Sequence, residues 1–142
     1  MAILNYTTTI SAEKTVGEIH SILAKAGASE IAYEHSNGQV VAVKFQIIHA
    51  DQPLWFRMAP RPDGVLVSMN RDRAERRYRT ASQAHRTAWR ILKDAIEAQM
   101  AIYQTQQGDI AEIFLPYALD SNNQTFYAAF TESRVKALKA AN

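Results

Sequence analysis

Within the segment from Gln39 to His49, apolar residues stand at every second position from Val41 to Ile47, directly after an Asn37-Gly38 pair. An Asn-Gly pair adopts positive φ easily, as the two-residue turns of β-hairpins require, so it is a strong local hairpin signal. Ile31 and Tyr33 alternate with polar neighbours before the pair. The pattern predicts an antiparallel hairpin whose second strand has one apolar face and one polar face. We expect Val41, Val43, Phe45 and Ile47 on the first, and Lys44 and Gln46 on the second.

A second turn is expected over residues 50–53, before a strand from Leu54 to Ala59. That strand would place Phe56 and Met58 on one side and Trp55 and Arg57 on the other. Two prolines and a glycine between Pro60 and Gly64 predict a further turn. Val65–Met69 fits either an added strand or a short helix. Three threonines beside Tyr6 favour another strand over Ile3–Thr9.

Two segments have apolar residues at helical spacing. The first begins after Ser11 and stops at Gly27, with Val16, Ile19, Leu23 and Ala26 on one side. The second is a longer helix over residues 82–104, opened by Thr80 or Ser82 and ended by Gly108. It has two adjoining apolar stripes, which are Ala84, Ala88, Ile91, Ala95 and Ile102, and Trp89, Leu92, Ile96, Met100 and Tyr103. So wide an apolar face predicts deep burial or contact with another subunit.

Two shorter helical segments are expected near the C-terminus. One runs from Ile110 to Leu115 and is stopped by Pro116, and the other is capped by Asn122 or Asn123. Phe126, Phe130 and Val135 would pack inward from the last helix. A chain of 142 residues without repeats or a linker predicts one α+β domain over residues 1–142. We expect a small antiparallel sheet in the N-terminal half, packed by one N-terminal and two or three C-terminal helices.

Several classes of protein are excluded by what the sequence lacks. The absence of cysteine excludes disulfides, cysteine nucleophiles and thiolate metal sites. There is no glycine-rich phosphate loop or G-x-S-x-G elbow, and the four histidines lack metal-ligand spacing. We therefore expect a protein that is not an enzyme and has no cofactor or metal. No apolar run approaches the roughly 18 residues of a membrane span, and Met1–Ser11 does not look like a secretory signal. We expect a cytoplasmic protein without membrane contact.

Positive charge is concentrated in one segment. The chain has a net charge of +2, but residues 57–93 contain ten Lys and Arg against three Asp and Glu, and nine of the ten are arginines. The planar guanidinium fork matches pairs of phosphate oxygens. The segment therefore indicates a phosphorylated ligand, nucleic acid or an acidic partner surface, and the alternative is a solvated face. Asn70–Arg79, the most polar stretch, is expected to be an exposed loop.

Two groups in this segment combine aromatic rings with cations. Arg86, Trp89, Arg90 and Lys93 lie on adjoining faces of the long helix, and Trp55, Phe56 and Arg57 are consecutive on a strand. A ring for stacking and guanidinium groups for phosphate are what a nucleotide needs. The alternative is that Trp89 packs in the core and its basic neighbours face water. We expect Arg57, Arg86, Arg90 or Lys93 to hold phosphate, and Trp89 or Tyr117 to supply an aromatic wall.

Four strings of the sequence carry a resemblance. They are Asn5–Ile19, Ala88–Asp94, Glu97–Ile102 and Phe114–Tyr117. With these strings the chain resembles a family of small phage and prophage proteins, and in size and layout it is similar to the first-described Thoeris anti-defence sponges. The resemblance implies a non-catalytic protein in the host cell cytoplasm that sequesters cyclic ADP-ribose signals. It also implies a homo-oligomer, a dimer or hexamer, with ligand pockets at subunit interfaces, and it allows a separate pocket for cyclic oligonucleotides. From the family we carry over a basic residue at Arg57 and an aromatic one at Trp89.

Two other functions remain open. One is a phage accessory protein that binds nucleic acid through the arginines between Arg71 and Arg79, which have no counterpart in the family. The other is a protein inhibitor of a bacterial defence complex. Salt dependence separates nucleic-acid binding from the capture of a small ligand, because many phosphate contacts make affinity fall steeply with salt.

Overall fold

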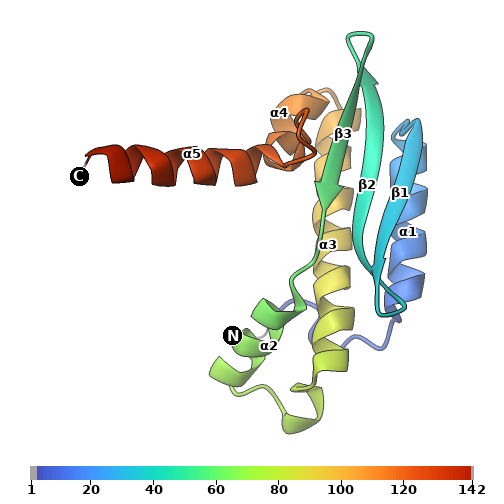
Figure 1. The fold of residues 1–142 in the computed structure, drawn as a ribbon. Coiled ribbons are helices and arrows are strands. Elements are labelled where there is room, and N and C mark those ends of the chain that lie inside the picture. The colour runs from blue at the N-terminus through green and yellow to red at the C-terminus, as the bar shows by residue number, and fades with distance from the viewer. Residues whose placement is uncertain (1–2, 142) are drawn as a thin grey trace.

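A three-stranded antiparallel sheet is packed on one face by two long helices (Figure 1). The computed structural model describes residues 3–141, without the side chains of 135–138, 140 and 141. This architecture confirms the expected α+β class. In chain order the elements are α1 (Ala12–Lys25), β1 (Glu30–Ser36), β2 (Gln39–His49), β3 (Gln52–Met58), α2 (Pro62–Arg71), η1 (Arg76–Tyr78), α3 (Ala81–Gln104), α4 (Ile110–Phe114), η2 (Leu115–Tyr117) and α5 (Phe126–Ala141).

The sheet has the order β1-β2-β3 and is joined by two tight turns. Asn37 and Gly38 form the first with φ values of 52° and 77°, as their sequence predicts. Ala50 and Asp51 form the second with φ values of 50° and 63°. Because this turn needs only two residues, β3 begins at Gln52, two residues before the predicted start.

The core lies between the sheet and the two helices α1 and α3. Phe45 of β2 stacks on Phe56 of β3 with ring centroids 5.2 Å apart. The predicted core face is confirmed for Val43, Ile47 and Met58, which are also buried here. Val41 is only half-buried, because the register shift opposite Glu34 and His35 leaves it without a partner on β1. The helices contribute Ile19, Leu23, Trp89, Ile96 and Met100 to the same cluster. Lys44, Gln46, Trp55 and Arg57 have the opposite parity and lie on the other face of the sheet.

The N-terminal segment is not the predicted strand. Residues 4–7 form turns instead, with Asn5 at a φ of 62°. The segment lies along α3, where Gln83 Nε2 donates to the backbone oxygens of Tyr6 and Thr8 and Thr87 Oγ1 donates to that of Asn5. Side chains of α3 thus donate to the backbone oxygens that would otherwise bond to a neighbouring strand.

Residues 60–79 contain more helix than the sequence indicated. Pro62 begins α2, where its fixed φ and missing N–H suit the first helical position, so Val65–Met69 is helical. The stretch from Asn70 to Arg79 is mostly exposed, as expected, although it includes the end of α2 and the short 3-10 helix η1.

The helix α3 begins at the predicted cap, Thr80, but ends before Gly108. Its last residue is Gln104, and Gln106 adopts the left-handed conformation with a φ of 61°. The helix α5 extends away from the rest of the chain (Figure 1). Phe126 and Phe130 are 45% and 61% exposed, so the expectation that they pack inward is wrong. The Val135 side chain lies outside the described residues.

Candidate functional site

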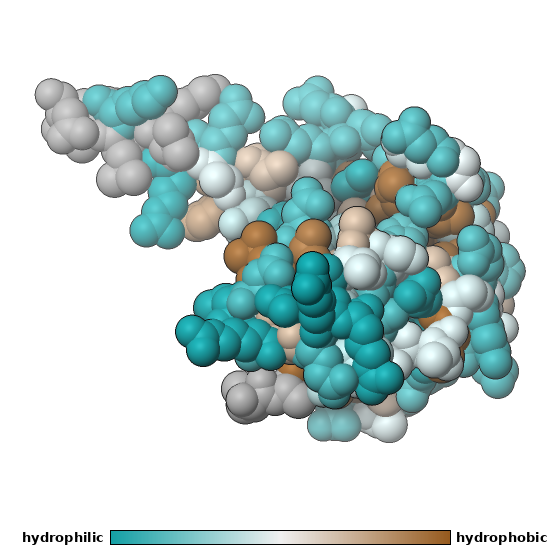
Figure 2. All heavy atoms as spheres, turned by 90° about the horizontal axis from the view of Figure 1, so that it is seen from below, coloured by the Kyte–Doolittle hydropathy of each residue, from teal (hydrophilic) through white to brown (hydrophobic). Residues whose placement is uncertain are grey.

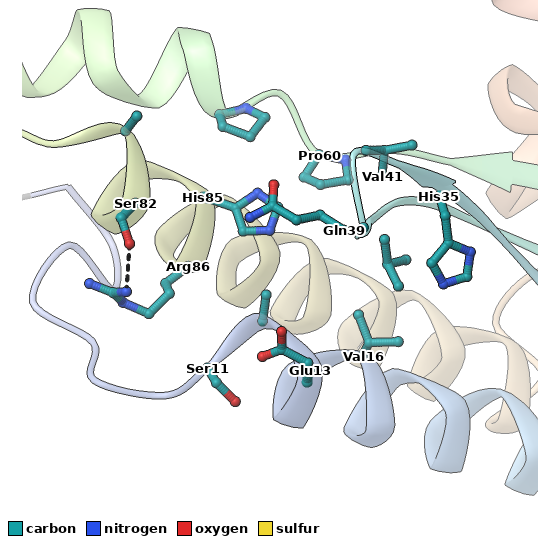
Figure 3. Close-up of a pocket in the computed structure, with 15 residues that line it drawn as sticks. Ser11, Glu13, Val16, His35, Gln39, Val41, Pro60, Ser82, His85 and Arg86 are labelled. Carbon is teal, nitrogen blue, oxygen red and sulfur yellow. Dashed lines mark hydrogen bonds between the residues drawn. The ribbon is translucent and has the colours of Figure 1, made fainter.

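A cavity of about 770 Å³ lies where α1 and α3 begin (Figure 3). Its walls come from the first turns of these helices, the β1–β2 hairpin, and the residues between β3 and α2. Protein cavities of about 300–1,000 Å³ hold small molecules, so this one has room for a ligand of nucleotide size. The polar side chains in its lining are Ser11, Glu13, His35, Gln39, Ser82, His85 and Arg86.

The two helices begin at the same end of the molecule. Ser11 Oγ accepts from the backbone N–H of Lys14 at 3.1 Å, and Thr80 Oγ1 accepts from that of Gln83 at 3.1 Å. Each cap satisfies one N–H of the first turn and leaves the N–H groups of the two preceding residues without an acceptor inside the helix. Because α1 and α3 run parallel, the positive ends of both helix dipoles lie at this cavity (Figures 1 and 3).

Arg86 is the one arginine among the described residues that line the cavity. Its Nη1 donates to Ser82 Oγ at 2.9 Å and its Nη2 donates to Gln83 Oε1 at 2.6 Å. A guanidinium group has five N–H donors. These two bonds therefore orient the group and leave three donors for a ligand.

Glu13 and two histidines complete the charged and titratable lining. Glu13 lies in the first turn of α1, where its carboxylate suits the positive end of the helix dipole. His35 enters from β1 and His85 from α3 (Figure 3), and each imidazole can donate or accept a hydrogen bond. Free helix N–H groups, a guanidinium and imidazoles in this lining can bind the phosphate of an organic ligand, whereas the Glu13 carboxylate repels it.

Arg57 lies on a different surface from Arg86. Its Nε and Nη2 donate to the two carboxylate oxygens of Glu34 at 2.6 and 3.2 Å, on the sheet face opposite to α1 and α3. This hydrogen-bonded contact lowers the pKa of Glu34 and raises the pKa of Arg57. A second hollow, of about 690 Å³, lies between β3 and α5. Its lining consists of Arg57, Arg61, Thr125, Tyr127, Ala128, Thr131, Glu132 and Lys139.

The other expected ligand-binding residues of α3 have protein partners. Trp89 is fully buried in the core, so its ring does not face a ligand. Arg90 Nη1 donates to Glu18 and Thr15 and so joins α3 to α1. Lys93 Nζ lies 2.6 Å from a carboxylate oxygen of Glu97, and this contact raises the pKa of Lys93.

Tyr117, in η2, is half-buried against the core. Of the six residues expected to bind ligand, only Arg86 lines the main cavity, and the six do not form one site. The sequence did identify both helix caps, Ser11 and Thr80. It contained no sign that the two capped ends meet, because the parallel course of α1 and α3 is a tertiary property. The sequence did offer one signal of a site at the start of α3, which is His85 beside Arg86 just after the Thr80 cap.

Within the described residues, no group of three or more His, Asp or Glu side chains is arranged to hold a metal ion. No helix in this part of the chain has the length and apolar character needed to cross a membrane. Neither a scan against models of protein families nor searches of curated proteins and of solved structures finds a match to this chain.

Proposed function

We propose that this protein binds a phosphorylated ligand of nucleotide size in the cavity at the start of α1 and α3 and holds it without chemical change. The observation that carries the proposal is the meeting of two helix N-termini and Arg86 at one cavity of about 770 Å³. Phosphate oxygens accept hydrogen bonds from the first turns of helices and from guanidinium forks. A partly enclosed site strengthens these interactions relative to open water.

The resemblance to Thoeris anti-defence sponges suggests the class of ligand, a cyclic ADP-ribose-type signal. Such a molecule combines a pyrophosphate with an adenine ring. In the proposed arrangement, the pyrophosphate lies at the first turns of α1 and α3 within reach of Arg86. The adenine lies against the apolar part of the lining, where Val16, Val41 and Pro60 are found. A phage protein of this kind would act in the host cytoplasm by lowering the free concentration of the signal.

We also propose that the protein is a homo-oligomer. Along the first apolar stripe of α3, Ala84 and Ala88 are buried within the chain. Ala95 and Ile102, further along the same stripe, are exposed, and Ile102 is exposed at 39%. A second copy packed on this half of α3 would remove these side chains from water. Light scattering at micromolar concentration tests the proposal, and a monomeric mass contradicts it.

Isothermal titration calorimetry with cyclic ADP-ribose tests the binding site. Arg86→Ala removes a charge-assisted contact to phosphate and is expected to weaken binding about ten- to a hundredfold. The matched control is Arg134→Ala, which removes an exposed arginine of α5 outside the cavity and should leave affinity unchanged. Mass spectrometry should recover the ligand intact after incubation. Equal affinities of the parent and Arg86→Ala, or recovery of a hydrolysed product, would contradict the proposal.

A further inference from the structure

Three helices of this protein end with the same pair of backbone hydrogen bonds. At the end of α1, the N–H of Gly27 donates to Ala24 O at 3.1 Å and the N–H of Ala28 donates to Leu23 O at 3.0 Å. At the end of α2, the corresponding bonds are Arg73 to Asn70 at 3.3 Å and Ala74 to Met69 at 3.0 Å. At the end of α3, they are Gln106 to Tyr103 at 3.1 Å and Gln107 to Ile102 at 3.0 Å. All three are Schellman motifs.

The residue that follows the cap in this motif has a positive φ, which favours glycine. Gly27 has this position in α1 with a φ of 94°. Arg73 has it in α2 with a φ of 53°, and Gln106 has it in α3 with a φ of 61°. Arginine at this position makes the protein less stable than glycine would, because the arginine Cβ is crowded in the left-handed region. The same holds for Gln106, so the strain alone assigns no role to either side chain.

Arg73 belongs to a strongly basic surface. Residues 71–79 contain five arginines against Asp72 and Glu75, a net charge of +3. We call Arg71, Arg73, Arg76, Arg77 and Arg79 the arginine segment. The segment lies at the lower end of the molecule in Figure 1, and Figure 2, a view from below, shows strongly hydrophilic side chains over that end.

Both carboxylates of residues 71–79 are bound by arginines of the same segment. Asp72 accepts from Arg71 at 2.8 Å, and Glu75 lies 3.1 Å from Arg77 Nε. Among the described residues, no carboxylate lies within 4.0 Å of the guanidinium groups of Arg73, Arg76 or Arg79. Arg79 is half-buried and its Nε is closed to solvent, so this donor does not face an external anion. The guanidinium groups of the exposed Arg73 and Arg76 are thus available to an external anion.

We propose that the arginine segment binds the phosphate backbone of double-stranded DNA independently of base sequence, a function separate from the small-ligand cavity. A duplex offers the dense row of phosphates that several guanidinium forks can contact together. Base stacking on a single strand would need a free aromatic ring. Tyr78, the aromatic residue of this segment, has its ring in an edge contact with Tyr6 at 5.4 Å and beneath Arg77 at 4.7 Å. Contacts to phosphate alone predict weak affinity, with a Kd of about 10⁻⁴–10⁻⁶ M.

Arg73→Gly is the decisive variant because it changes stability and binding in opposite directions. Glycine removes the strain at positive φ, so the midpoint of thermal unfolding should rise by about 1–4 °C. Loss of one phosphate contact should weaken binding to duplex DNA about tenfold at roughly 50 mM salt. It should also reduce the slope of log affinity against log salt by about one. Arg76→Ala, outside the motif, should weaken DNA binding in the same way.

Two controls keep the test specific. Gln106→Gly relieves the same strain in the same motif at the end of α3, so it should raise the unfolding midpoint and leave DNA affinity unchanged. Arg134→Ala lowers the net charge by one at an exposed site on α5 and should have little effect on binding. Fluorescence anisotropy with a labelled duplex of mixed sequence, measured over a range of salt concentrations, provides the affinities.

Several results would overturn the proposal. They are an absence of salt-dependent binding by the parent protein, equal loss of affinity in Arg73→Gly and Arg134→Ala, and equal binding of the duplex and of polyglutamate. The last result would mean that the segment binds acidic protein surfaces instead. None of these outcomes bears on cyclic ADP-ribose binding, so the two proposals stand or fall separately.

Discussion

Replacement of Gln83 by methionine is expected to lower the free energy of unfolding by about 2 kcal/mol. Gln83 is only 5% exposed in the first turn of α3. Its Nε2 donates to Tyr6 O at 2.8 Å and to Thr8 O at 2.9 Å. Methionine has a similar length and volume but no amide group, so it also loses the bond that Gln83 Oε1 accepts from Arg86 Nη2. Each of the two partly buried carbonyl groups then loses its donor at a cost of about 1 kcal/mol or more.

Urea unfolding followed by circular dichroism measures this loss. A decrease of this size should also lower the thermal midpoint by about 4–8 °C. The same helix provides a matched control in Gln99, whose Oε1 is buried without a hydrogen-bond partner. Gln99→Met removes an unsatisfied polar atom, so stability should stay the same or rise. Equal losses in the two variants, or a loss below about 0.5 kcal/mol in Gln83→Met, would refute the reasoning.

Two further predictions concern stability. Trp89→Phe removes a buried ring N–H that has no acceptor, so the free energy of unfolding in urea should change by no more than about 1 kcal/mol. Trp89→Ala leaves a cavity in the core and should lower the free energy of unfolding by about 3–5 kcal/mol. Arg57 lowers the pKa of Glu34 below its ordinary value of 4.5. The ionised Glu34 carboxylate therefore stabilises the folded protein fully above pH 4.5, and this stabilisation is lost as the pH falls through the lowered pKa. Both side chains are more than one third exposed, so the gain of the parent over Glu34→Gln should be below about 1 kcal/mol at neutral pH and vanish in acid.

The sheet and the caps of α1 and α3 could be predicted because their signals are local. The predicted cap of the last helix, Asn122 or Asn123, is wrong, because α5 begins at Phe126 and Thr125 Oγ1 accepts from the N–H of Ala128. Asn37-Gly38 determines its own turn, and the alternation that follows determines which side chains of β2 face the core. The strand expected over Ile3–Thr9 failed for a non-local reason. Its threonines favour an extended chain, but Gln83 and Thr87 bind its carbonyl groups from α3. No pattern within the segment could show that contact.

The candidate site was harder to predict for the same reason. Helical spacing places Trp89, Arg90 and Lys93 on adjoining faces of α3, but it does not say which face meets α1 and which meets the sheet. In the structure, Trp89 faces the core and Arg90 binds Glu18 of α1. Arg86 lies one turn before Arg90, at the end of the helix where the cavity opens.

The two edges of the sheet differ in a way that matters for assembly. The N–H of Leu119 donates to Trp55 O at 2.8 Å, and Ala118 forms a bridge with Phe56, so this part of the β3 edge is covered. No described segment pairs with the outer edge of β1.

The open edge of β1 is protected more by shape than by charge. Glu30 lies on this strand, whereas the Glu34 carboxylate is bound to Arg57 of β3. The register shift opposite Glu34 and His35 leaves Val41 of β2 as an extra residue. Such a bulge strengthens the local twist of the sheet beside β1, so a second copy would meet a bent edge. Deletion of Val41, the extra residue, would therefore straighten the edge of β1 and favour edge-to-edge polymerisation of the protein.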